Sequence, residues 1–82
     1  MDYYAIGQRI RRVRRARGLS QEQAAEQTGI SAVHMSHIES GNTKLSLPVF
    51  VRLTEVLQVS ADELLQGKEI FIFDGFAGAD PK

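Results

Sequence analysis

Two histidines are the residues in this 82-residue chain whose spacing first suggests chemistry. His34 and His37 are three positions apart, which places both side chains on one face of a helix and could suit a metal ion. The chain contains no cysteine and no convincing third ligand, so we expect no metal site. No nucleophile–base–orienter set and no glycine-rich phosphate loop is visible either. The sequence therefore predicts neither an enzyme nor a protein that needs a cofactor.

Five short helical segments must position whatever residues carry the function. Apolar residues recur at helical spacing along the chain, and serines at positions 20, 31, 46 and 60 are suitable N-caps. Gln23 and Glu63 follow two of these serines by three residues, which completes a capping box in each case. Glycines 18, 29, 41 and 67 are placed to end helices. The expected helices cover residues 3–17, 20–28, 32–40, 46–57 and 60–66, so the chain is predicted to be all-α.

The second and third of these helices form a helix-turn-helix arrangement, because a tight turn containing Gly29 separates them. Ala25 is small where two helices must nearly touch, and Gly29 permits the positive φ that such a turn often needs. Met35 and Ile38 point to one side of the third helix and would anchor it in the core. The opposite side is left free, and a helix has the right diameter for the major groove of DNA.

The free side of the third helix has the chemistry of base recognition. Ser36 and His37 can form hydrogen bonds with base edges, whereas Ala32 and Val33 can lie against thymine methyl groups. Val33 is informative because a β-branched apolar residue has little local reason to face water. The alternative is an ordinary solvated helix face.

Residues 6–65 resemble the Cro/repressor-type helix-turn-helix family, often called XRE-like. The resemblance rests on the following positions: Arg14, residues 18–21, Ala25, residues 29–31, residues 38–41 and residues 59–64. It implies a five-helix, phage-repressor-like domain that usually binds operator DNA as a dimer. Ala24 departs from the family, which usually has a larger aliphatic residue at this position, and the packing around it is therefore in question.

The resemblance also assigns roles to individual residues. It implies that Gln21 contacts a phosphate and that Arg14 and Glu39 form a salt bridge between the first and third helices. An ordinary polar turn is the alternative for the loop that follows the third helix. The residues expected to contact DNA are Gln21, Ser31, Ala32, Val33, Ser36, His37, Ser40, Asn42, Thr43 and Lys44.

Charge is distributed unevenly along the chain, although the net charge is zero. Residues 1–21 contain six arginines and one acid, whereas residues 54–82 contain two lysines and six acids. One face could therefore meet phosphate, or the surface charge could simply keep the domain in solution. Arg11, Arg12 and Arg15 are expected to form a solvated face, because the first helix lies behind the motif. No apolar stretch is long enough for a membrane span or placed as a signal peptide, which predicts a cytoplasmic protein without membrane contact.

Residues 68–82 are expected to form a short extended tail beyond a helix-turn-helix domain of residues 1–67. The apolar run at residues 70–73 favours pairing with a second copy, or else folding back over the domain. The leading hypothesis is a transcriptional regulator, either repressor or activator, that binds a pseudo-palindromic operator in double-stranded DNA as a homodimer. The alternative is a protein-binding module, such as an antitoxin component, that has a protein partner and only secondary DNA binding. A third hypothesis is the DNA-binding end of a longer regulator, although Met1 and Lys82 are expected to be natural ends.

Overall fold

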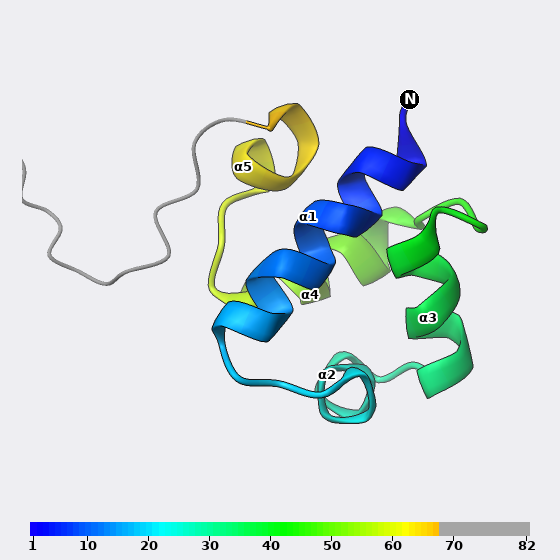
Figure 1. The fold of residues 1–82 in the computed structure, drawn as a ribbon, viewed down its shortest axis with the longest axis vertical. Helices are drawn as coiled ribbons and strands as arrows, with labels where there is room; N and C mark the ends of the chain where they lie inside the picture. Colours follow the sequence, from blue (N-terminus) through cyan, green and yellow to red (C-terminus); the bar gives the residue numbers. More distant parts are fainter. Residues whose placement is uncertain (68–82) are drawn as a thin grey trace, which may run out of the picture.

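The computed structural model describes residues 1–67, which form five α-helices (Figure 1). The helices are, in order, α1 (Tyr3–Ala16), α2 (Gln21–Thr28), α3 (Ala32–Ser40), α4 (Leu47–Leu57) and α5 (Ala61–Gln66). The expected all-α, five-helix architecture is thereby confirmed. Helix α1 ends one residue earlier than expected, because Arg17 is its C-cap. The expected tail, residues 68–82, lies outside the described residues.

Serine hydroxyls begin four of the helices. Ser20, Ser31, Ser46 and Ser60 each accept a hydrogen bond from the backbone N–H three residues further on. These bonds satisfy N–H groups that have no partner within the first turn of a helix. Gly29 ends α2 with a φ of 86°, in the left-handed region that glycine adopts without a steric penalty. The turn between α2 and α3 is thus fixed at one end by Gly29 and at the other by Ser31.

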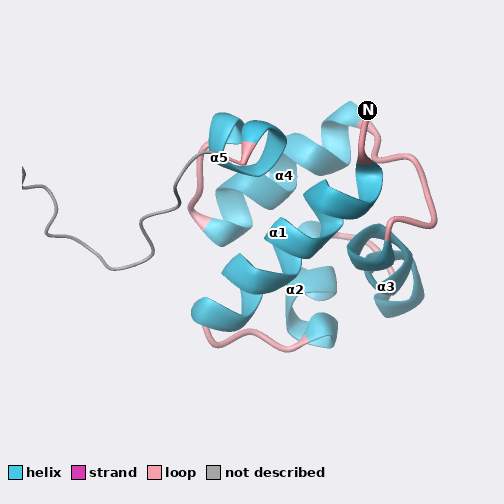
Figure 2. Cartoon of the chain, turned by 45° about the horizontal axis from the view of Figure 1, so that its top comes forward, coloured by secondary structure: helices cyan, strands magenta, loops and turns pink. Residues whose placement is uncertain are grey.

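The hydrophobic core lies between α1 and the remaining helices. Helix α1 contacts α3 and α5, which lie on opposite sides of it (Figure 2), while α2 contacts α3 and α4. Ala24 and Ala25 are both buried in α2, so the small residue at position 24 is accommodated within the core. The buried apolar residues are Ile6, Ile10, Val13, Ala24, Ala25, Met35, Ile38, Phe50, Leu53, Leu57 and Leu64.

Helix α1 passes directly over the C-terminal end of α3, and Gly7 makes this close approach feasible. A Cβ atom at Gly7 would lie 2.7 Å from the carbonyl oxygen of Glu39, nearer than real Cβ atoms come to other atoms. The obstructing atoms belong to the backbone of α3 and have little freedom to move aside. The position of α3 is therefore set by direct backbone contact with α1.

Three arginine side chains hold the C-terminal ends of other helices. Arg9 donates to the end of α5, Arg17 to the end of α4 and Arg52 to the end of α2. The accepting carbonyl oxygens, at 2.8 to 3.2 Å, are those of Leu64 and Leu65, Leu57 and Gln58, and Gln27, respectively. A cation is favoured at these positions, because the last carbonyl groups of a helix lack partners and carry its negative dipole end.

Candidate nucleic-acid interface

A buried ion pair connects α1 to α3. Arg14 Nε donates to Glu39 Oε2 at 2.5 Å and Arg14 Nη2 donates to Glu39 Oε1 at 3.1 Å, in a bidentate arrangement. The two side chains are only 8% and 3% exposed. Arg14 Nη1 also donates to the carbonyl oxygen of Leu19 at 2.7 Å, in the loop before α2. A pair with this burial and this many bonds holds the orientation of α3 relative to α1.

Two glutamines extend the Arg14–Glu39 pair. Gln21 Nε2 donates to Glu39 Oε1 at 3.0 Å, and Gln8 Nε2 donates to the carbonyl oxygen of Glu39 at 3.0 Å. The resemblance places Gln21 at a phosphate. In the structure its half-buried side chain lies at the first position of α2, and its amide group donates to Glu39. Neither glutamine bond was predicted, because the partners are 18 and 31 residues apart in the sequence. The start of α2 is therefore connected to the pair that orients α3.

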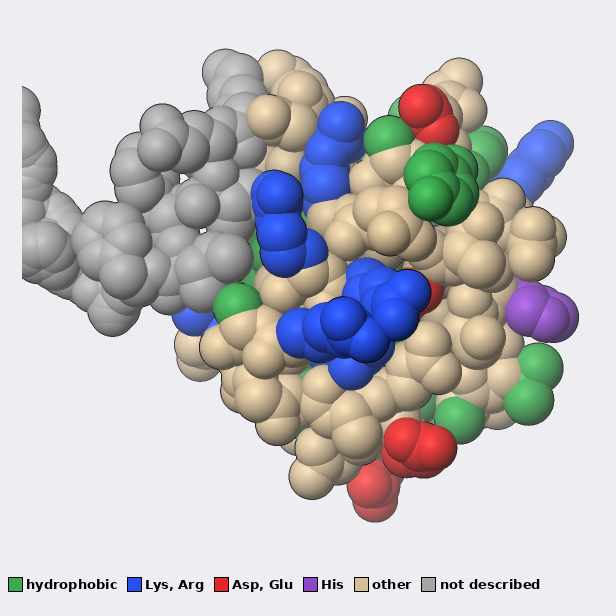
Figure 3. All heavy atoms as spheres, viewed as in Figure 1, with side chains coloured by type: hydrophobic (Ala, Val, Ile, Leu, Met, Phe, Trp, Pro, Cys, Tyr) green, Lys and Arg blue, Asp and Glu red, His purple; other side chains and the backbone are tan. Residues whose placement is uncertain are grey.

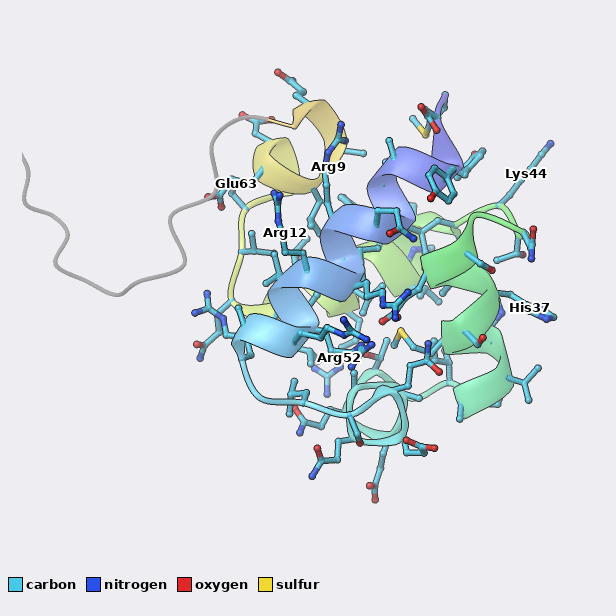
Figure 4. All side chains as sticks on the ribbon, viewed as in Figure 1. Arg9, Arg12, His37, Lys44, Arg52 and Glu63 are labelled. Atoms are coloured by element: carbon cyan, nitrogen blue, oxygen red, sulfur yellow. The ribbon has the colours of Figure 1, made fainter. Side chains whose placement is uncertain are left out.

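The outward side of α3 is only partly as expected. Val33 is 67% exposed and His37 is exposed, and Figure 4 shows His37 pointing away from the rest of the domain. Ser36 is half-buried. Ala32 is less exposed than expected, because it is half-buried and packs partly against the core. A helical-wheel analysis misses this packing because it considers α3 without the rest of the core.

The hydroxyl of Ser31 and the loop after α3 form local hydrogen bonds. Ser31 Oγ accepts the N–H of His34 at 3.0 Å. In the loop, Ser40 Oγ donates to the carbonyl oxygen of Ser36 and accepts from Asn42 Nδ2 at 3.1 Å. Thr43 is half-buried, while Lys44 is exposed and extends on the same side of the domain as His37 (Figure 4). Lys44 is thus the cation of this loop that is placed to reach a partner of α3.

The described residues contain no candidate metal site. Within residues 1–67, no three side chains of His, Cys, Asp or Glu gather where they could hold a metal ion. His34 is half-buried and His37 exposed, so the two histidines have different surroundings. None of the helices in residues 1–67 is both long and apolar enough to cross a membrane.

Comparison with known proteins identifies the arrangement of α2 and α3. Residues 5–66 match the family described as the helix-turn-helix domain. The chain belongs to this family. The match includes all of α2, α3, α4 and α5 and most of α1. The predicted resemblance to Cro/repressor-type helix-turn-helix proteins is confirmed.

Named relatives of this helix-turn-helix domain are transcriptional regulators. YazB of Bacillus subtilis, named as an uncharacterized regulator, is 41% identical over 64 residues, which cover 78% of this chain and 93% of YazB. SinR of the same organism is 35% identical over 71 residues, which cover 85% of this chain and 64% of SinR. The chain therefore spans almost all of one relative and less than two thirds of the other.

Solved structures give the same result for the fold. The restriction-modification controller protein C.AhdI of Aeromonas hydrophila superposes with a TM-score of 0.75 at 34% identity, covering 78% of this chain and 97% of C.AhdI. The P22 c2 repressor, solved in complex with a synthetic operator, has a TM-score of 0.73 at 32% identity, covering 77% of this chain and 96% of the chain in that structure. The predicted phage-repressor-like fold is thereby confirmed.

Proposed function

We propose that the protein is a transcriptional regulator that binds double-stranded DNA sequence-specifically and reads the major groove with α3. The observation that carries this proposal is the rigid presentation of one side of α3. Arg14 and Glu39 fix the helix from behind, while Val33 and His37 remain exposed in front. Family membership and the regulator names of the relatives support the proposal.

Base recognition comes from the exposed side of α3 in this proposal. The two methyl groups of Val33 lie against thymine methyls, and His37 forms a hydrogen bond with a base edge or a phosphate. Ser36 is less accessible and contributes a hydroxyl at the edge of this surface. Ala32 packs against the core and contributes shape more than direct contact.

Phosphate contacts lie on either side of α3 and fix its register in the groove. Gln21 and the first N–H groups of α2 lie on one side, and the loop with Lys44 lies on the other. These contacts carry no sequence information themselves, but they set the depth and angle of the helix. The remaining proposed backbone contacts are Ser31, Ser40, Asn42 and Thr43.

The decisive experiment is selection of bound fragments from a pool of random duplex DNA, followed by titration of the selected site. We expect one enriched sequence with two-fold symmetry. We also expect an affinity that falls with salt, because each phosphate contact contributes ~0.9 to the log–log slope. Absence of binding to every duplex, or binding that is insensitive to salt, would refute the proposal.

A homodimer is the expected binding form, and α4 provides a candidate contact. Leu47 and Val51 lie one turn apart and are 72% and 48% exposed, directly after the loop that carries Lys44. Two copies meeting there would be related by a two-fold axis, as operators with half-sites about 34–36 Å apart require. The tail at residues 68–82, beyond the domain of residues 1–67, is the other candidate.

Sedimentation distinguishes the two dimer surfaces. If α4 forms the contact, Val51→Asp sediments as a monomer, because a carboxylate is costly in an apolar interface. If the tail forms the contact, a chain lacking residues 69–82 sediments as a folded monomer with weaker operator binding. The wild-type chain is the control, and a wild-type monomer on and off DNA would contradict the homodimer altogether.

A further inference from the structure

Three arginines on the outer face of α1 have no assigned role in the fold. Arg11, Arg12 and Arg15 are exposed, and within the described part of the chain none of their guanidinium groups forms a hydrogen bond or an ion pair with another residue. Together with Gln8 and Arg9 they line an open hollow on the surface of α1. Figure 3 shows basic side chains gathered over this helix in the middle of the view.

This arrangement of like charges is unfavourable for the isolated helix. Arg15 lies three residues from Arg12 and four from Arg11, so their guanidinium groups are neighbours and repel one another. The dipole of α1 favours Arg15, which is in the last turn, but Arg11 lies before that turn. A bound anion would offset the repulsion, whereas the folded domain does not.

The arginines differ in which neighbouring helix they approach. At about 100° per residue, Arg11 and Arg15 lie about 60° and 100° around α1 from Arg14, which faces α3. Arg12 lies about 160° away by the same count, and Figure 4 shows it on the side of α1 that faces α5. Arg11 and Arg15 therefore border the Arg14–Glu39 pair, to which Gln21 also donates.

We propose that Arg11 and Arg15 bind phosphate oxygens of the duplex backbone next to the contact of Gln21. This inference rests on the proposed function and extends its surface from α2 to α1. Guanidinium groups match phosphate geometry because they can donate two parallel hydrogen bonds. Arg12 carries the same charge on the same helix and lines the far edge of the same hollow. It lies the furthest of the three around α1 from Arg14, and in this proposal it makes no such contact. The arrangement changes our expectation that all three arginines form a solvated face.

The test measures how binding to a selected operator depends on salt for Arg11→Gln, Arg15→Gln and Arg12→Gln. Loss of one phosphate contact lowers the log–log slope by ~0.9, so the affinity deficit of the Arg11 or Arg15 variant shrinks about 8-fold over a tenfold rise in salt. For the double variant Arg11→Gln/Arg15→Gln, the affinity deficit shrinks about 60-fold over the same rise in salt. Arg12→Gln keeps the wild-type slope and is the matched control. Sequence preference stays the same in all variants, because phosphate contacts carry no sequence information.

Two results would overturn the inference while leaving the proposed function intact. One is an unchanged slope in the Arg11 and Arg15 variants, which would leave the hollow to another anion, such as an acidic protein segment. The other is an equal loss of slope in all three variants, which would indicate long-range attraction without a specific contact. A wild-type chain that binds no duplex would refute the proposed function itself. Circular dichroism of each variant confirms that glutamine, a good helix former, preserves α1.

Discussion

Replacing either residue of the Arg14–Glu39 pair alone is predicted to lower the free energy of unfolding more than replacing either member of any other pair. Replacing both residues together is predicted to have a much smaller effect. Arg14→Met leaves the carboxylate of Glu39, which is 3% exposed, with Gln21 as its remaining side-chain partner. Glu39→Met leaves the guanidinium of Arg14 with only the carbonyl oxygen of Leu19. Either change leaves a buried charge without its ion-pair partner, which is unfavourable because the charge is no longer solvated by water.

The expected loss for each single substitution is about 3–5 kcal/mol of unfolding free energy, the range for breaking a buried pair. The free energy of unfolding of such a domain is only about 5–15 kcal/mol in total. Each single variant should therefore be only marginally stable. Replacing both residues removes both charges and fills the space with apolar atoms, which is often neutral or stabilising. The double variant Arg14→Met/Glu39→Met should therefore be more stable than either single variant.

Urea denaturation followed by far-UV circular dichroism measures these differences, provided that the slope of free energy against urea stays constant. The four chains form a double-mutant cycle, and the coupling energy should be several kcal/mol. Additive single effects, or single losses below ~1 kcal/mol as for exposed pairs, would contradict the reasoning from burial and bidentate geometry.

Three further predictions concern other parts of the domain. Val33→Ala should change base preference at one operator position by roughly 1–3 kcal/mol, whereas Lys44→Ala should weaken binding to all DNA sequences alike. Selection experiments and salt titrations distinguish these effects, and the opposite pattern would show that α3 is not the helix that reads the groove. Arg9→Met should lower the unfolding free energy by roughly 1–2 kcal/mol through loss of its bonds to the end of α5, and Arg12→Met, measured in the same urea titration, should stay within about 0.5 kcal/mol of wild type. Gly7→Ala should destabilise by roughly 1–3 kcal/mol, because overpacking against the backbone of α3 outweighs the ~1 kcal/mol gained from helix propensity; an increased melting temperature would show that α1 and α3 can separate freely.

Local chemistry explains why the helices could be predicted from the sequence. Ser20, Ser31, Ser46 and Ser60 act through N–H groups only three residues away, so their effect depends on short spacing alone. The pair of Met35 and Ile38 likewise follows from the period of a helix. Sequence reasoning is strong where both partners of an interaction lie within one turn of each other.

Contacts between distant segments were harder to anticipate. Arg9 and Arg17 donate to backbone carbonyl oxygens 40 or more residues away. Every residue has such an oxygen, so residue types do not reveal which one accepts the bond. Gln21 has a carboxylate partner in α3 that only the packing of α2 against α3 reveals. A helical wheel predicts an outward-facing Ala32 because it considers one helix alone, whereas in the structure Ala32 packs partly against the core.

The arginine contacts at the helix ends place a one-sided constraint on how this sequence can change. Arg9, Arg17 and Arg52 bind carbonyl oxygens, and every amino acid supplies one at the accepting position. Substitution at exposed accepting residues such as Leu65 and Gln27 therefore leaves the bond intact. Loss of the arginine removes it, since no other side chain combines the same reach with a fixed fork of donors. Exposed residues that accept these bonds can therefore be substituted, whereas the arginines that donate them cannot.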